Sequence, residues 1–185
     1  MRFPDCMRLP NAENTFAGFP IAQTWTDLAL WEEFLNRHPV ASLVELGTWQ
    51  GGMAAFLALQ ARARGIQFTT IDHQSGQMRS SELVNFLGAS SLVRDIFEPG
   101  FMRTVLDLAP TPRLLFCDNG NKRRELSEIA PLLGPGDYVA VHDWHSEAGP
   151  EDIPATWFAI FEAECEKVSS LTRYFRLPAS ADITK

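Results

Sequence analysis

The stretch Val44–Gly52, VELGTWQGG, decides the fold of this chain. An apolar run leads into Glu45, and three glycines follow before the alanine- and leucine-rich segment that starts at Met53. This order predicts a buried strand, a tight turn and then a helix, because glycine tolerates positive φ and lets a ligand or another backbone come close. The unpaired N–H groups at the start of that helix could donate to an anionic ligand.

Strand and helix alternate along the rest of the chain, with short connections and strands that are apolar on both faces. This pattern predicts a doubly wound, mostly parallel α/β sheet with helices on both sides. We expect Thr26 or Asp27 to cap the first helix and the C-terminal end of the sheet to be abbreviated. The predicted helices cover residues 26–38, 53–64, 80–88, 101–108, 122–133 and 155–168, and the predicted strands cover 41–46, 67–72, 90–97, 113–118, 137–143 and 171–177.

Length and composition indicate one domain of 185 residues, with an N-terminal arm (1–25), an α/β core (26–176) and a tail (177–185). The net charge of −7 argues against nucleic acid and anionic membranes as partners. No apolar run has the length of a signal peptide or a membrane span, so we expect a cytoplasmic protein. Three cysteines without paired spacing predict neither a disulfide framework nor a zinc site.

Acidic residues end the predicted strands, namely Glu45, Asp72, Asp95, Asp118 and Asp143. The carboxyl ends of parallel strands meet at one edge of a sheet, where ligands bind at the point of strand-order reversal. Carboxylates gathered there need cations or hydrogen-bond donors. Each acid taken alone is also compatible with an ordinary helix cap or a solvated loop.

The glycine spacing bears on which ligand the turn would take. A dinucleotide site favours G-x-G-x-x-G, whereas here Thr48, Trp49 and Gln50 separate Gly47 from Gly51. The missing middle glycine argues against a pyrophosphate. Asp72 at the end of the next strand could still accept two hydrogen bonds from a ribose. A glycine turn that only packs helix on strand is the alternative.

The segment ELGTWQGG, together with the acidic residues Asp72 and Asp95, resembles the class I S-adenosylmethionine (SAM)-dependent methyltransferases. More narrowly, NTFAGFPIAQTW before it, and LLFCDNGNKRRELSEIAPLLGPGDYVAVHDWHS after it, are similar to the cephalosporin hydroxylase family. The resemblance covers roughly Asn14 to Trp144 and implies the class I methyltransferase fold. It also implies SAM contacts from Glu45, Gly47, Thr48, Gly51, Asp72, His73, Asp95 and Ile96, running from the methionine end through the ribose to the adenine.

The same resemblance implies a divalent metal site, for Mg or Mn, at Asp118, His142 and Asp143. The chain departs from its relatives at His142, where they have an acid, and at Asn121, where they often have a histidine that acts as the base. Lys122 or His145 could replace that base, with Asp118 and Asp143 as the other catalytic candidates. Lys122 is also compatible with a simple solvated position at a helix start, and His142 with a hydrogen-bonded loop histidine.

The predicted function is SAM-dependent O-methylation of a small-molecule hydroxyl, with or without assistance from a divalent metal. The sequence is compatible with a homo-oligomer but does not establish one. One alternative is a SAM-binding protein in which the changes at Asn121 and His142 have removed catalysis. A second is an NAD-dependent oxidoreductase.

Overall fold

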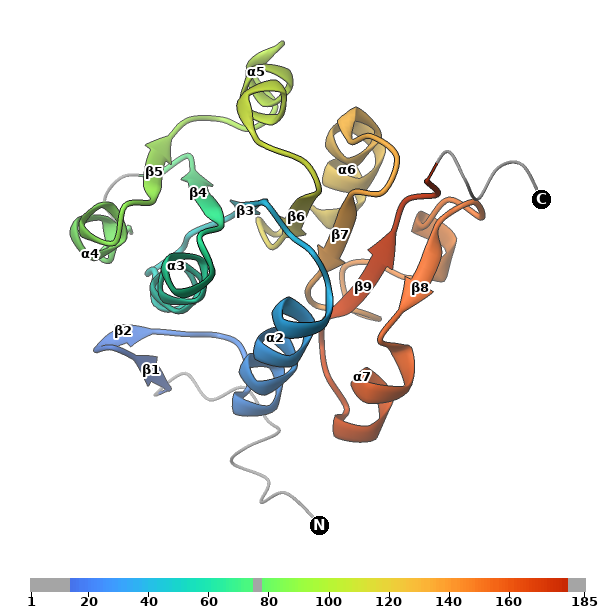
Figure 1. Ribbon diagram of the computed structural model, residues 1–185, viewed down its shortest axis with the longest axis horizontal. Coiled ribbons are helices and arrows are strands. Elements are labelled where there is room, and N and C mark those ends of the chain that lie inside the picture. The colour runs from blue at the N-terminus through green and yellow to red at the C-terminus, as the bar shows by residue number, and fades with distance from the viewer. Residues whose placement is uncertain (1–13, 75–77, 180–185) are drawn as a thin grey trace.

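The computed structural model describes residues 14–74 and 78–179. A seven-stranded sheet in the order β5-β4-β3-β6-β7-β9-β8 forms its centre (Figure 1). The strands from β5 to β7 are parallel, and β9 is antiparallel to both of its neighbours. The predicted mostly parallel α/β fold is confirmed. The strands are β3 (Ser42–Leu46), β4 (Gln67–Asp72), β5 (Ser90–Val93), β6 (Arg113–Cys117), β7 (Tyr138–Val141), β8 (Phe158–Ile160) and β9 (Arg173–Arg176).

Helices cover both faces of this sheet (Figure 1). On one face lie α2 (Trp25–Arg37), α3 (Gly52–Arg64), α4 (Ser81–Phe86) and α7 (Glu162–Val168). On the other lie α5 (Phe101–Leu108) and a helical segment made of α6 (Lys122–Arg124), η1 (Glu125–Ile129) and η2 (Ala130–Leu132). Successive strand side chains point to opposite faces, so Leu43 joins the first core and Val44 the second.

The helical segment that follows β6 changes pitch along its length. Helix was predicted over 122–133, and the segment is helical, but η1 has π-helical turns and η2 has 3₁₀ turns. Pro131 lies in the first turn of η2, where its missing N–H costs least. A π-turn inside a helix often lies at a functional site.

Thr24 caps α2, so the prediction of Thr26 or Asp27 is wrong. The Thr24 hydroxyl accepts a hydrogen bond from Asp27 N at 3.0 Å, and Thr24 N donates to Asp27 Oδ2 at 3.2 Å. This reciprocal pair is a capping box, with Asp27 as its third helical residue.

The C-terminal part of the sheet differs most from the prediction. The predicted helix over 155–168 divides into β8 and α7 at Phe161, which has a φ of 63°. The apolar run WFAIF fits helical and strand periods alike, which explains the error. Since β8 and β9 complete the sheet beyond β7, the prediction of an abbreviated C-terminal end is also wrong.

The described part of the N-terminal arm packs against the core. Its two short strands, β1 (Thr15–Phe16) and β2 (Phe19–Pro20), form a hairpin, and the Phe16 ring meets Phe56 of α3 edge-on at 5.4 Å. Residues 1–13 of the predicted arm and 180–185 of the predicted tail lie outside the described residues.

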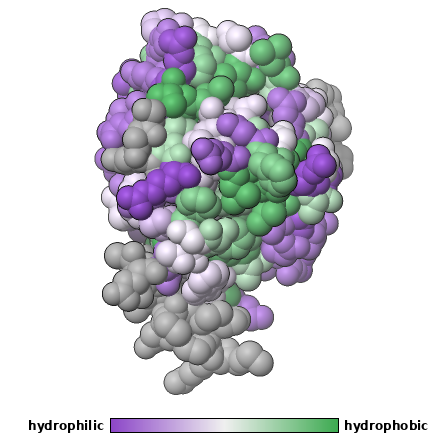
Figure 2. All heavy atoms as spheres, turned by 90° about the vertical axis from the view of Figure 1, so that its left-hand side faces the viewer, coloured by the Kyte–Doolittle hydropathy of each residue, from purple (hydrophilic) through white to green (hydrophobic). Residues whose placement is uncertain are grey.

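The opposite edge of the sheet, at β5, carries apolar side chains at its surface. Phe86 of α4 is 87% exposed and Val93 of β5 is 49% exposed, and Figure 2 shows apolar side chains interspersed with polar ones on this side of the molecule.

Among residues 14–74 and 78–179, each helix is too short or too polar to cross a lipid bilayer.

Candidate functional site

A cavity opens where the strand order reverses. β3 and β6 are neighbours in the sheet, but the chain runs outward from β3 to β4 and β5 before it returns to β6 and β7. The loops that follow β3, β4 and β6 enclose a cavity of about 270 Å³ beyond the carboxyl ends of these strands. This is where open α/β sheets bind ligands. The cavity is lined by Pro20, Ile21, Ala22, Gln23, Gly47, Thr48, Trp49, Gly52, Met53, Asp72, His73, Asp118, Asn119, Gly120 and Lys122.

Two of the loop glycines are required by contacts within the protein. Gly47 has a φ of 96°, and a Cβ there would overlap the Asp118 carbonyl and lie 2.7 Å from Asn119 Cα. Gly51 has a φ of 89° and faces Ser80, so it does not line the cavity. Gly47 thus lets the end of β3 approach the end of β6, and Gly51 lets the start of α3 approach Ser80, which precedes α4. The proposed ligand contact at Gly51 has no support in this geometry.

Asp72 organises the loop through its carboxylate. Its Oδ2 accepts hydrogen bonds from Thr48 N at 3.0 Å and Trp49 N at 2.9 Å, and its Oδ1 accepts one from Gln74 N at 3.0 Å. The His73 imidazole lies 3.3 Å from the same carboxylate. Thr48, Asp72 and His73, three of the predicted cofactor residues, therefore lie together on the cavity wall.

Glu45 supports the loop from behind the cavity. Its side chain is fully buried and its Oε2 accepts a hydrogen bond from Thr70 Oγ1 at 2.6 Å, while Thr70 in turn contacts the Thr48 hydroxyl at 2.6 Å. Burial raises the pKa of Glu45 well above its usual value, and Asp118 and Asp72 add to the shift. Glu45 does not line the cavity, so it lies behind the cavity wall and not at the SAM-contacting position that was predicted for it.

Asp95 and Ile96 line a second hollow, of about 430 Å³, that adjoins the cavity. The two hollows share His73 and Asn119 in their walls. Ile96 is buried, and Asp95 accepts a hydrogen bond from Phe97 N at 2.9 Å, which fixes the turn after β5. The structure thus brings the predicted ribose and adenine residues to neighbouring positions on one edge of the sheet.

The predicted metal ligands Asp118, His142 and Asp143 come together in one cluster, with donor atoms within 4.8 Å of one another. His142 is 3% exposed, and its Nδ1 lies 3.1 Å from Asp118 Oδ1 and 3.3 Å from Asp143 Oδ2. Neither ring nitrogen of His142 makes a hydrogen bond with a described residue. The contacts of Nδ1 with the two carboxylates are therefore electrostatic. Burial alone would lower the pKa of His142, but the two carboxylates raise it to about 10, which makes an imidazolium at neutral pH.

Lys122 completes this cluster. The side chain is 2% exposed, and its Nζ lies 2.8 Å from Glu147 Oε2, 2.9 Å from Asp143 Oδ2 and 3.5 Å from Asp118 Oδ1. Burial would lower the pKa of Lys122, but these carboxylates outweigh it and hold the pKa above its usual value. A lysine held as an ammonium cannot accept a proton at neutral pH. The burial of Lys122 contradicts the solvated alternative, and its contacts with carboxylates, which favour the ammonium, argue against the prediction that it acts as a general base.

The cluster in this form does not fit a divalent metal. Asp118 Oδ1 and Asp143 Oδ2 each lie within 3.5 Å of both Lys122 Nζ and His142 Nδ1. A metal bound to both oxygens at about 2.1 Å would stand beside an ammonium. Mg²⁺ also prefers oxygen ligands to an imidazole. The predicted ligands are together, but two cationic side chains already neutralise them.

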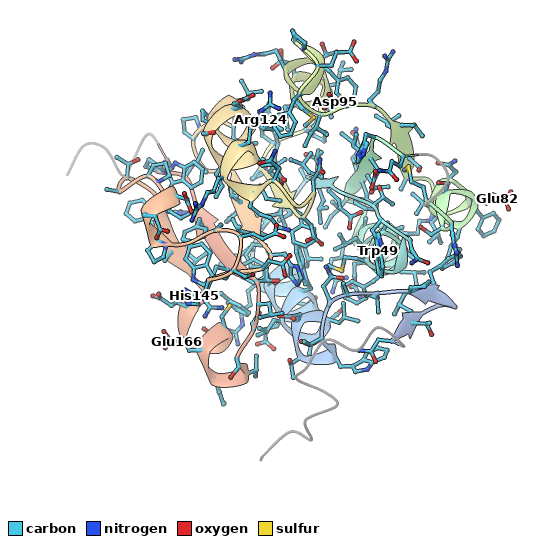
Figure 3. The ribbon with its side chains drawn as sticks, turned by 180° about the vertical axis from the view of Figure 1, so that it is seen from behind. Trp49, Glu82, Asp95, Arg124, His145 and Glu166 are labelled. Carbon is cyan, nitrogen blue, oxygen red and sulfur yellow. The ribbon has the colours of Figure 1, made fainter. Side chains whose placement is uncertain are left out.

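His145 lies apart from this cluster. It has a φ of 72° and lines a different hollow of about 350 Å³, together with Trp144 and Trp157. Figure 3 shows His145 near Glu166, on the side of the molecule that carries α7, whereas Trp49 lies on the side of α3. The structure thus gives the His145 side chain no contact with Asp118 or Asp143, the catalytic candidates beside which it was predicted to act as the base.

Several residues of the site were missed from the sequence. Gln23 of the arm donates a hydrogen bond from Nε2 to Asp118 Oδ2 at 2.7 Å, and Trp49, 42% exposed, stands in the cavity wall. The segment FPIAQTW indicated only a family resemblance, although two of its residues, Pro20 and Ile21, line the cavity. Glu147 lies in a loop after β7, where no local pattern predicts a contact with Lys122.

Comparisons with solved structures give the fold. An apo structure of CmcI matches with a TM-score of 0.70 and 18% sequence identity, over 91% of this chain and 78% of that chain. A cmcI structure with Mg and SAM gives 0.69 and 17%, over 90% and 77%. The O-methyltransferase TomG from Streptomyces achromogenes, in complex with SAM, gives 0.50 and 15%, over 84% and 79%.

The chain has the Rossmann-like methyltransferase fold. At these identities the similarity concerns the fold alone. No protein-family model and no curated protein sequence matches the chain.

Proposed function

We propose that this chain is a SAM-dependent methyltransferase of the class I superfamily, related to the cephalosporin hydroxylase family, that methylates a hydroxyl of a small molecule. One observation carries the proposal. The cavity lies at the switch point of the sheet, with Asp72 and His73 on its wall and the Asp95–Ile96 hollow directly beside it. The presence of SAM in structures of the same fold supports this assignment.

The residues present fit the cofactor. Asp72 and His73 would hold the ribose, the hollow at Asp95 and Ile96 would hold the adenine, and the Thr48 loop would hold the methionine end. The missing pyrophosphate fingerprint agrees with a cofactor that has no phosphate. Bound SAM would supply an electrophilic methyl group on a sulfonium.

The protein's own part in the reaction is positioning and electrostatics. The carboxylate of Asp118, which lines the cavity and belongs to one cluster with Asp143, would accept a hydrogen bond from the acceptor hydroxyl, hold its oxygen in place and take up its proton as the methyl group is transferred. The imidazolium of His142 and the ammonium of Lys122, which contact these carboxylates, would stabilise the negative charge that develops on that oxygen. This chemistry needs no metal.

Release of S-adenosylhomocysteine, measured by mass spectrometry with a panel of phenols, catechols and sugar alcohols, tests the proposal. We expect release with at least one hydroxyl acceptor, and a loss of at least about tenfold in His142→Gln. His145→Gln is the matched control and should keep its rate, because His145 lies outside the cluster. If SAM binds but no acceptor yields product, the chain is a binding protein without catalysis.

A further inference from the structure

Lys122 is a buried cation at the place where the family resemblance predicts a metal. Its ammonium contacts one carboxylate from the end of β6, one from the end of β7 and one from the loop beyond, which are Asp118, Asp143 and Glu147. Taking a lysine out of water is costly unless its charge is paired and its donors are used. Here three carboxylate oxygens lie within 3.5 Å of its Nζ.

Two carboxylate oxygens that would be available to a metal already contact two cationic side chains. Lys122 Nζ and His142 Nδ1 each contact both Asp118 Oδ1 and Asp143 Oδ2. Gln23 takes the second oxygen of Asp118 at 2.7 Å, which fixes the orientation of this carboxylate toward the cluster. Every oxygen of Asp118 thus has a partner within the protein.

The charges within the cluster nearly balance. Asp118, Asp143 and Glu147 contribute three negative charges, which face the ammonium of Lys122 and the ring of His142. The position of Lys122, at the first residue of α6, lets its side chain reach back to the end of β6, while α6 and η1 hold its backbone. Lys122 also lines the cavity itself, so its charge belongs to the site.

We propose that the Lys122 ammonium takes the place of a divalent metal in this site. Lys122 is then a positioning residue that fixes the carboxylates of Asp118 and Asp143 beside the cavity. The inference rests on the proposed function for its catalytic meaning. The placement of the cation, however, is tested without any turnover. The site is then metal-independent, and removal of the lysine opens it to a divalent cation.

The test is a Mn²⁺ titration of the full chain, followed by the electron paramagnetic resonance signal of free Mn²⁺. The wild type and Lys122→Arg, which keeps a cation, should leave Mn²⁺ free. Lys122→Met removes the charge but retains much of the volume. We expect it to bind one Mn²⁺ at least about tenfold more tightly than the wild type, because the carboxylates lose their neutralising partner. Adding Asp118→Asn to Lys122→Met should abolish this gain.

Two results would overturn the proposal. The first is stoichiometric Mn²⁺ binding by the wild type that disappears in Asp118→Asn. This comparison tests the proposal even if Lys122→Met does not fold. The second is a folded Lys122→Met protein, verified by circular dichroism, that gains no affinity for Mn²⁺. A parallel thermal shift with SAM on the wild type tests the proposed function separately, since cofactor binding does not depend on the outcome of the Mn²⁺ titration.

Discussion

Replacement of Gly47 by alanine probes the close approach of β3 and β6 that builds the cavity. The φ of Gly47 is 96°, a conformation that costs an L-residue roughly 1 kcal/mol. The new Cβ would also overlap the Asp118 carbonyl and lie 2.7 Å from Asn119 Cα, and overpacking of this kind costs about 1–3 kcal/mol. Both contacts are backbone atoms of a central strand end, so they cannot move aside cheaply. We expect Gly47→Ala to lose about 2–4 kcal/mol of unfolding free energy.

Gly65→Ala is the matched control for this change. Gly65 also has a positive φ, 69°, but nothing lies within 4 Å of the position of its Cβ. The control should therefore lose only the conformational term, about 1 kcal/mol. Urea denaturation, extrapolated linearly to water, measures both. Equal losses in the two variants would refute the reasoning, because they would show that the contact with the end of β6 carries no free energy.

Three further changes test other parts of the site. Trp49→Gly should keep the unfolding free energy within about 1 kcal/mol of the wild type, since Trp49 has a φ of 45° and is half exposed, yet it should weaken SAM binding in calorimetry. Asp72→Ala should cost about 2–4 kcal/mol in urea denaturation, because three backbone N–H groups lose a charged acceptor. Burial raises the pKa of Glu125 to about 8, so the folded protein retains a proton that the unfolded chain releases above about 4.5. Stability should thus fall as the pH rises from about 4.5 to about 8. In Glu125→Gln, denaturation curves should lose this component of the fall, and a wild-type slope in the variant would contradict the assignment.

The central part of the fold could be predicted because local signals and tertiary packing agree there. The apolar strands and the glycine turn at Gly47 each favour one structure, and the alternation of strands and helices leaves a parallel sheet as the natural arrangement. Around Phe161 the local signal was ambiguous. Which period prevailed depended on β9, a strand later in the chain, against which β8 pairs.

The site was predictable to the extent that it depends on strand ends. Asp72, Asp118 and Asp143 lie at one edge of the sheet because parallel strands end there together. The state of Lys122 could not be predicted, since it is decided by burial and by three carboxylates, two of which, Asp143 and Glu147, come from the distant segment after β7. The contact between Gln23 and Asp118 likewise joins segments far apart in the sequence.

Isothermal titration of SAM into the wild-type protein tests the account most directly, with NAD⁺ titrated in parallel. We predict that one SAM binds per chain with a dissociation constant below about 100 µM, and that NAD⁺ gives no binding heat. Asp72→Asn should weaken the SAM interaction at least about tenfold, because Asp72 both shapes the loop and faces the cavity. No binding heat with SAM at about 1 mM, together with an unchanged melting temperature, would contradict the account.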